Sequence, residues 1–253
     1  MRIRIRFSKE GPVRFVGHLD FMRSFQKYIK KSGLSACYSG GFSPHMLMSF
    51  AAPLVVGEET LSDYVDVDFA YRDTAPLTDQ ELYRLKDMGL SNDELPLPPS
   101  RRDFCRILTS AMPEGVKALD AARVGLIKGS KAMSLVRYAS YQIHLLDGFL
   151  QDVDIRSGLA AFSAQNEIVI HKKTKKAEKD VDIRPMIVHL DGDGGTVQLT
   201  CASGSVENLK PSAVMEAFSC FADKEYDPYG FRVVRTELYD ENRVSLLELG
   251  TLF

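Results

Sequence analysis

Apolar residues first recur at every second position, as in a strand, and then at the spacing of a helix. This order limits the folds that the chain can adopt. Ile3, Ile5 and Phe7 alternate with three arginines, which is the pattern of a strand that buries one face. From His18, apolar residues recur at helical spacing as far as Gly33, a helix stop signal. The pattern therefore predicts helices packed on a sheet.

The next segments complete a recognisable order. We predict strands over 46–56, 64–69 and 116–124 and helices over 78–88 and 101–112. If the helix over 78–88 is an insertion, the order is strand, helix, strand, strand, helix, strand. This is the ferredoxin-like order, in which two helices cover one face of an antiparallel sheet.

The second half of the chain repeats this plan. We predict strands over 141–146, 167–171, 183–190, 196–202 and 231–238, and helices over 153–164 and 211–221. A glycine-rich run over 191–195 is a strong hairpin signal. We therefore predict an α+β protein made of tandem ferredoxin-like domains with antiparallel sheets, the first over residues 1–130 with its helical insertion and the second over residues 131–253.

The charge is nearly balanced overall but uneven along the chain. The formal net charge is −2, which argues against a uniformly basic nucleic-acid binder. Residues 1–50 carry nine Lys or Arg against two acids, a net of +7, whereas residues 57–99 carry eleven acids against three, a net of −8. This polarity could serve an anionic ligand, or the two segments could pair with one another. Both interpretations stay open.

The first strand and the loop over 39–45 carry the first candidate site residues. Arg2, Arg4 and Arg6 lie on the other face of the first strand, which we expect to be in water, as we expect for Asp66 and Asp68 on the strand over 64–69. The loop Ser39-Gly40-Gly41-Phe42-Ser43-Pro44-His45 can be only a turn, because its glycines permit positive φ. It can equally present backbone N–H groups, the hydroxyls of Ser39 and Ser43, and His45 to an anion.

Two histidines could carry chemistry. His18, at a helix start, could simply bond Asp20 or a strand carbonyl. Alternatively, His18 and His45 could meet and do acid/base work on a phosphodiester or a nucleobase. No third ligand has metal-site spacing, and the four cysteines (Cys37, Cys105, Cys201 and Cys220) form no Cys-x-x-Cys pair. We expect reduced, mostly buried thiols, no metal and no cofactor.

A lysine tract over 172–176 is the second cationic feature. It could be a solvated strand end, or it could join the first strand in a groove for a phosphate backbone. Asp182 and Arg184 are expected to form a local pair after it. The candidate RNA-binding residues are thus Arg2, Arg4, Arg6, Arg23, Ser39, Phe42, Ser43, Lys172, Lys173, Lys175, Lys176 and Arg184.

Several function classes find no support in the sequence. No phosphate-binding loop, nucleophile elbow or dinucleotide fingerprint is present. Phe7, Phe50 and Phe69 are expected to face inward, which argues against an aromatic stacking platform on the sheet. No stretch resembles a signal peptide or a run of about 18 apolar residues, so we expect a cytoplasmic protein without membrane contact.

The motifs of the first 69 residues, together with the lysine tract, Asp182-Ile183-Arg184-Pro185 and Lys210-Pro211, support a family resemblance. They are Phe7-x-Lys9, Phe15-x-Gly17-His18-Leu19-Asp20, Arg23, Tyr38-Ser39-x-Gly41-Phe42-Ser43-Pro44-His45 and Pro53-Leu54-x-x-Gly57. The chain resembles the radical SAM-linked family of unknown function, a domain found alone or as the C-terminal part of a radical SAM protein.

The resemblance implies a partner and a setting. Genes of that family tend to lie near those of ribosomal proteins and of an E/G-type ribonuclease. Since this chain has no Cys-x-x-x-Cys-x-x-Cys motif, any radical chemistry would belong to another polypeptide. A fainter, topological likeness links the chain to the tandem ferredoxin-like RNA-handling proteins of CRISPR systems.

The leading hypothesis is an RNA-binding accessory protein that works with a radical SAM enzyme on ribosomal or transfer RNA. Two alternatives remain. One is a metal-independent RNA-processing enzyme that uses His18 and His45, so the sequence leaves open whether the protein is an enzyme. The other is a protein-interaction domain that docks a radical SAM subunit.

Overall fold

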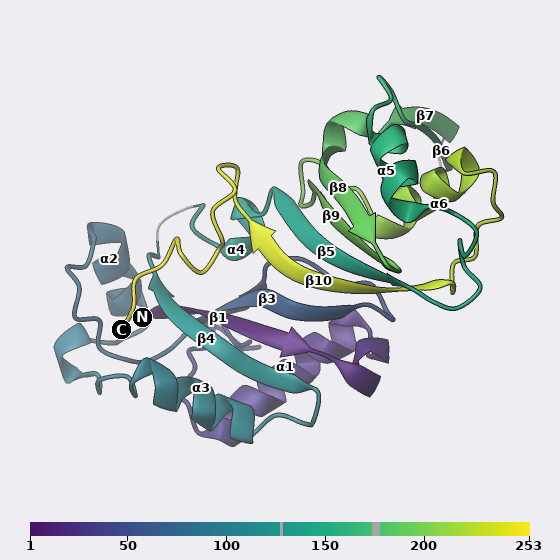
Figure 1. Ribbon diagram of the computed structural model, residues 1–253. Helices are drawn as coiled ribbons and strands as arrows, with labels where there is room; N and C mark the ends of the chain where they lie inside the picture. The colour runs from purple at the N-terminus through teal and green to yellow at the C-terminus, as the bar shows by residue number, and fades with distance from the viewer. Residues whose placement is uncertain (127–128, 174–177) are drawn as a thin grey trace. The chain divides into compact units, whose positions relative to one another are not determined.

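The computed structural model describes residues 1–126, 129–173 and 178–253 (Figure 1). The chain is an α+β protein: within the described residues, eight strands belong to the larger sheet and two form a separate antiparallel pair. Contacts divide it into two compact units, Met1–Val136 with Leu238–Phe253, and Arg137–Glu237. The sequence analysis placed the boundary at residue 130 and assigned the whole C-terminal end to the second domain, whereas residues 238–253 pack with the first unit.

The first unit is an antiparallel sheet with helices packed on it. Its strands run in the order β4-β1-β3, and β2 pairs with the other edge of β3. Figure 1 shows α1 and α3 on the same side of β1 and β4. The elements are β1 (Arg2–Lys9), η1 (Gly11–Phe15), α1 (His18–Ser32), β2 (Met48–Phe50), β3 (Glu59–Asp68), α2 (Asp79–Asp87), η2 (Asn92–Glu94), α3 (Arg101–Ser110), β4 (Val116–Val124) and α4 (Ala132–Leu135).

Helix α1 forms because its apolar residues recur on one side. Phe21, Phe25 and Ile29 are buried, and Gly33 ends the helix in the left-handed region at φ 74°. On the sheet, Ile3, Ile5 and Phe7 of β1 face the same core, and the rings of Phe7 and Phe25 lie 5.3 Å apart. The predicted inward positions of Phe7, Phe50 and Phe69 are confirmed by their burial.

The opposite face of β1 differs from the prediction. Arg2 is 4% exposed and Arg4 is 1% exposed, so they do not form a cationic face in water. The strand register places Arg2 opposite Asp68 and Arg4 opposite Asp66, and each arginine bonds its facing carboxylate. Opposite charges directly across a sheet attract, and here the two acids are buried as well.

All three guanidinium nitrogens of Arg4 donate hydrogen bonds within the fold. Its Nε and Nη2 donate to the Asp66 carboxylate at 2.8 and 3.0 Å, Nη1 donates to the carbonyl of Leu246 at 2.9 Å, and Nη2 also donates to that of Ser130 at 2.7 Å. The Ala132 N–H donates to Asp66 at 2.7 Å. The pair therefore ties β1 and β3 to the segments that cover this face.

The strand predicted over 46–56 is mostly irregular. Only Met48–Phe50 forms a strand, β2, which pairs with β3. The chain then passes through Pro53 and a turn at Gly57, where φ is 94°. Because proline supplies no N–H for a strand ladder, the pairing stops before it.

The second unit carries its own four-strand order. The strands follow one another as β10-β5-β9-β8, with β9 antiparallel to both β5 and β8. The glycine-rich turn lies between β8 and β9, as the sequence predicts. The elements are β5 (Tyr138–Leu145), α5 (Ile155–Ser163), η3 (Arg184–Met186), β8 (Ile187–Asp193), β9 (Thr196–Ala202), α6 (Pro211–Phe221) and β10 (Phe231–Tyr239).

The strand predicted over 167–171 lies in a separate two-stranded sheet. It corresponds to β6 (Val169–Lys173), which pairs only with β7 (Glu178–Asp182) in the described residues. The sequence analysis missed β7 because its residues are mostly charged and show no apolar alternation. Within the described parts of the chain, no helix has the length and hydropathy of a transmembrane span.

Helix α2 begins with a reciprocal cap. Glu81 Oε2 accepts hydrogen bonds from the Thr78 N–H at 2.8 Å and the Thr78 hydroxyl at 2.9 Å, while the Glu81 N–H donates to that hydroxyl at 3.3 Å. Glu81 Oε1 accepts from the Leu126 N–H at 3.0 Å. Burial raises the pKa of Glu81, but these hydrogen bonds and the charge of Arg123 outweigh it, so the pKa lies below its ordinary value.

We expect Arg4→Ala to lower the free energy of unfolding by about 3–5 kcal/mol, because it leaves the Asp66 charge buried without its partner. The double variant Arg4→Met/Asp66→Leu should recover part of that loss, with a coupling of about 1–3 kcal/mol. Urea denaturation of Arg4→Ala measures the loss, and denaturation of the wild type, Arg4→Met, Asp66→Leu and the double variant measures the coupling. Arg106→Ala, which breaks an exposed pair with Asp103, is the control and should cost less than about 1 kcal/mol. A cost for Arg4→Ala no larger than the control would contradict a structural role for the pair.

Glu81 should make stability depend on pH. Because its folded pKa is depressed, its contribution is present above the unfolded pKa and is lost as the pH falls through the folded value. When the pH is lowered from neutral into the acid range, we expect the free energy of unfolding to fall less for Glu81→Gln than for the wild type. Denaturation at a series of pH values tests this, with exposed Glu94→Gln as the control. Identical pH slopes for Glu81→Gln and the wild type would show that the cap does not hold the charged form.

Candidate functional site

The solvent side of α1 carries a stripe of basic residues. Arg23, Lys27, Lys30 and Lys31 are exposed, at spacings that place them on one helix face. No Asp or Glu occurs from residue 21 to residue 57. Arg23 pairs with Asp20 at 3.1 Å, but both side chains are largely exposed, so the pair holds Arg23 only weakly. The stripe is therefore a local excess of positive charge.

The basic stripe continues onto the loop that follows the helix. The Lys30 ammonium lies over the ring of Tyr38, 5.7 Å from its centroid. Such a cation–π contact is favourable and fixes the direction of the lysine. Tyr38 opens the 39–45 loop, so helix and loop share one surface. The sequence analysis named Arg23 for this site but not Lys27, Lys30 or Lys31, although their spacing was visible.

The base of the loop is clamped by hydrogen bonds. The Ser39 N–H donates to the His45 carbonyl at 2.8 Å, and the His45 N–H donates to the Ser39 hydroxyl at 3.0 Å. The same hydroxyl is 2.8 Å from His45 Nδ1. Gly41 has φ 93°, which a residue with a Cβ rarely adopts. The loop therefore is a defined turn, and its predicted serine and histidine partly serve to close it.

The tip of the loop displays an aromatic ring. Phe42 is fully exposed, at 112% of the reference value, and Ser43 is also exposed. No ring contact of Phe42 is recorded within the described residues. A large apolar side chain held in water beside a basic stripe is a typical contact for a partner. The loop can offer this ring for stacking.

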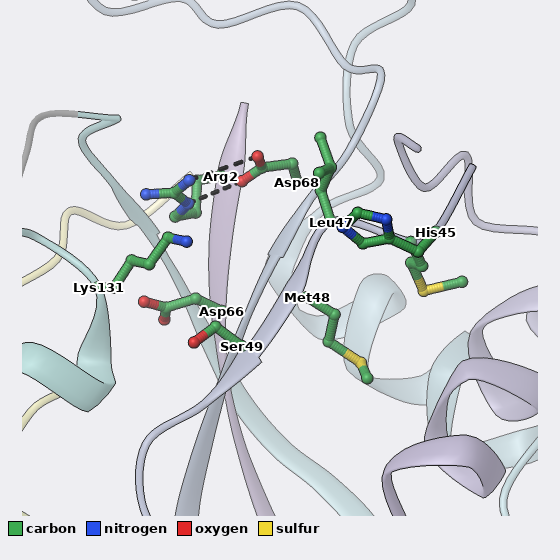
Figure 2. Close-up of a pocket in the computed structure, with 9 residues that line it drawn as sticks. Arg2, His45, Leu47, Met48, Ser49, Asp66, Asp68 and Lys131 are labelled. Carbon is green, nitrogen blue, oxygen red and sulfur yellow. Dashed lines mark hydrogen bonds and ion pairs between the residues drawn. The ribbon is translucent and has the colours of Figure 1, made fainter. Parts of the chain in front are cut away.

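A small polar pocket lies on the sheet face opposite the helices, next to the loop (Figure 2). Its volume is about 100 Å³, and its lining includes Arg2, His45, Ser49, Asp68 and Lys131. Figure 2 shows Arg2 bonded to Asp68 and Lys131 pointing towards Arg2. The sequence analysis missed Lys131, because it lies between periodic segments and no motif marks it.

The other candidate histidine lies in a different pocket. His18 makes an edge contact with the ring of Phe50 at 5.6 Å, and it lines a space of about 10 Å³ with Lys9 and Asp63. His45 does not line that space. The structure therefore does not bring His18 and His45 together, and Asp20, the partner suggested for His18, pairs with Arg23.

Lys9 and Asp63 are buried polar residues that the sequence analysis did not single out. The Lys9 ammonium donates to the Val16 carbonyl at 2.8 Å and lies 5.0 Å from the centre of the Phe21 ring. A period of two from Phe7 places Lys9 at an apolar position of β1. That displaced lysine is the signal from which the buried site could have been found.

The remaining predicted cations include Arg6 of β1 and the lysines of 172–176. Arg6 is half-buried, and its Nε has no hydrogen-bond partner among the described residues. For Lys172 and Lys173 the structure describes the backbone, which lies in β6, but not the side chains. Lys175 and Lys176 lie outside the described residues.

Arg184 holds backbone rather than the carboxylate of Asp182. Its Nε donates to the Ser163 carbonyl at 2.9 Å and its Nη1 to that of Ile187 at 3.3 Å. Asp182 instead accepts from the backbone N–H groups of Ile168 and Arg184. Asp182 and Arg184 therefore form the expected local pair through the Arg184 backbone N–H, while the Arg184 guanidinium has a structural role.

Three of the four thiols lie in the interior of the protein. Cys37, Cys105 and Cys201 are buried, and Cys220 is exposed. Burial, followed by the charge of Asp120, raises the pKa of Cys105 to about 11, so its thiol stays protonated at neutral pH. Within the described residues, no three His, Cys, Asp or Glu side chains are grouped as metal ligands.

Comparison with known proteins identifies a family but no activity. The model of a family described as uncharacterized proteins conserved in bacteria (DUF2344) matches residues 2–211. This match covers the basic stripe, the clamped loop and the polar pocket. A search of curated proteins found no match to the chain.

Proposed function

The chain belongs to the DUF2344 family of bacterial proteins, and we propose that it is an RNA-binding accessory protein that uses α1 and the 39–45 loop. The observation that carries this proposal is the contact of Lys30 with Tyr38, which joins the basic stripe to the loop. A basic track beside exposed aromatic rings is how proteins bind single-stranded nucleic acid, through phosphates and stacked bases.

The proposed surface differs from the groove predicted from the sequence. Arg2 and Arg4 are buried and bonded to carboxylates, so they do not form the open cationic groove that the sequence predicted. In contrast, Lys27, Lys30 and Lys31 of α1 lie in a segment, residues 21–57, that contains no Asp or Glu. Electrostatic attraction to RNA depends on such unpaired local charge rather than on the net charge of −2.

We further infer that the two units are ferredoxin-like repeats. The support is that the order β4-β1-β3-β2 in the first unit and the order β10-β5-β9-β8 in the second follow the same pattern along the chain. Helix α2 and the β6–β7 hairpin are then insertions. Fold likeness alone does not indicate function, so the RNA proposal rests on the surface and not on this topology.

The proposed partner is a radical SAM enzyme, to which this chain would present ribosomal or transfer RNA. The support is the resemblance of the loop and helix motifs to the radical SAM-linked family, together with the absence of a cluster-binding cysteine motif in this sequence. An acid/base enzyme that uses both histidines has less support, because His18 and His45 line different pockets.

Replacing Lys27, Lys30 and Lys31 together with alanine should weaken RNA binding and its salt dependence. Each lost phosphate contact lowers the slope of log K against log salt by about 0.7 for single strands, so the slope should fall by about two. Filter binding of a single-stranded RNA at several salt concentrations measures this. The control is Arg102→Ala/Arg106→Ala on α3. If the wild type shows no RNA affinity even at about 50 mM salt, where electrostatic binding is strong, the proposal is wrong.

Replacing Phe42 with alanine should weaken RNA binding by about 1–3 kcal/mol, the usual contribution of one stacked base, without changing the salt slope. The matched control is Tyr229→Ala, which removes another strongly exposed ring. Gel filtration with the radical SAM protein of the same organism distinguishes RNA binding from the alternative, in which the loop docks that protein. A complex lost in Phe42→Ala, with indifference to RNA, would instead make the loop a protein-docking site.

A further inference from the structure

The polar pocket of Figure 2 is built on the buried charges of the sheet face. Arg2 and Asp68 form part of its wall, with Arg2 Nε 2.7 Å and Nη2 3.4 Å from the Asp68 carboxylate oxygens. Asp66 forms another part, and it accepts three hydrogen bonds from Arg4 and Ala132. The oxygens of both acids are therefore already bonded to donors, which leaves little capacity to accept from a ligand.

Several hydrogen-bond donors that line the same pocket have no acceptor within the described residues. Within the described chain, no partner is recorded for Arg2 Nη1, the Lys131 ammonium, the Ser49 hydroxyl or His45 Nε2. Arg2 is 4% exposed, so its guanidinium can turn little and is held by Asp68. The pocket therefore offers hydrogen-bond donors to whatever enters it.

The backbone on both sides of Lys131 is fixed by the buried pair. Arg4 Nη2 donates to the Ser130 carbonyl at 2.7 Å, and the Ala132 N–H donates to Asp66 at 2.7 Å. These two bonds hold the Lys131 backbone against the sheet, while its side chain remains exposed. Figure 2 shows that side chain directed towards Arg2 and Asp66. The ammonium is thus positioned at the pocket rather than scattered over the surface.

We propose that this pocket binds a phosphate group, which accepts hydrogen bonds from Arg2, Lys131 and Ser49. Counting Arg4 behind the wall, three cations face two carboxylates, so the site has a positive balance. The pocket has a volume of about 100 Å³. That space suits a tetrahedral oxyanion and is too small for a whole nucleotide, since ligand pockets usually measure about 300–1,000 Å³.

The source of the phosphate group follows from the proposed RNA-binding function, on which this part of the proposal rests. His45 lines the pocket and also closes the 39–45 loop, so a strand that stacks on Phe42 would pass near the pocket. The phosphate would then be one of the bound strand. Inorganic phosphate or a phosphorylated small molecule offers the same chemistry, and the experiment has to separate these sources.

The first arm of the experiment uses inorganic phosphate and isothermal titration calorimetry at constant ionic strength. Wild-type protein should bind phosphate, and Lys131→Ala should bind it about tenfold more weakly or worse, because one charge-assisted hydrogen bond is lost. Lys117→Ala, which removes an exposed lysine of β4 outside the pocket, should match the wild type. Equal affinities for Lys131→Ala and the wild type would overturn the proposal.

The second arm uses single-stranded RNA over a range of salt concentrations. Lys131→Ala should reduce the salt slope by about 0.7, the value of one phosphate contact. Phosphate binding that depends on Lys131 together with an unchanged RNA slope would keep the pocket and overturn RNA as its source. Wild-type RNA binding without any phosphate or slope effect of Lys131 would reject the pocket and leave the RNA function intact. Phosphate binding that depends on Lys131, without any RNA affinity, would keep the pocket and reject the RNA function.

Discussion

The buried pairing of two arginines with two aspartates across β1 and β3 is the interaction on which the first unit depends. Burying ions is costly, and attraction offsets the cost only where geometry is good and the remaining hydrogen-bonding groups are satisfied. Arg4 meets this condition with four bonds to three partners. Because those partners include the carbonyls of Ser130 and Leu246, one ion pair fixes strands that are adjacent in the sheet and segments that are distant in sequence.

The same arrangement explains why the proposed RNA-binding surface lies elsewhere. Charge that is paired inside the fold attracts an external polyanion only weakly, so the +7 of the first 50 residues is divided between two roles. The strand arginines serve the scaffold, and the helix lysines face water. Helix α1 combines both aspects of the unit, because its apolar side packs on the sheet and its basic side is free for contacts.

Periodicity in the sequence predicted most elements but not their environment. The bounds of β4, β9 and α6 agree with the prediction because apolar spacing, glycine and proline mark them clearly. The alternation of β1 shows that its two faces differ, yet it cannot say that Asp66 and Asp68 will face Arg4 and Arg2. That information resides in the register between strands, which needs long-range pairing.

The candidate site was predictable to a similar extent. The glycines and proline of the 39–45 loop indicated a special turn, and Arg23 was named on the helix. Lys131 and the separation of the two histidines could not be derived, since both depend on how segments far apart in sequence meet in space. The displaced Lys9 of β1 was visible in the pattern but has meaning only once Asp63 is known to lie beside it in one pocket.

The clamp between Ser39 and His45 has a consequence for how such a protein can change over time. Because the hydrogen bonds that close the loop involve only its two ends, the residues between them contribute little to folding. Apart from Gly41, whose φ of 93° favours glycine, the exposed residues of the tip can therefore be exchanged with little cost to the scaffold. The loop is a place where specificity can diversify while the architecture beneath it is inherited intact.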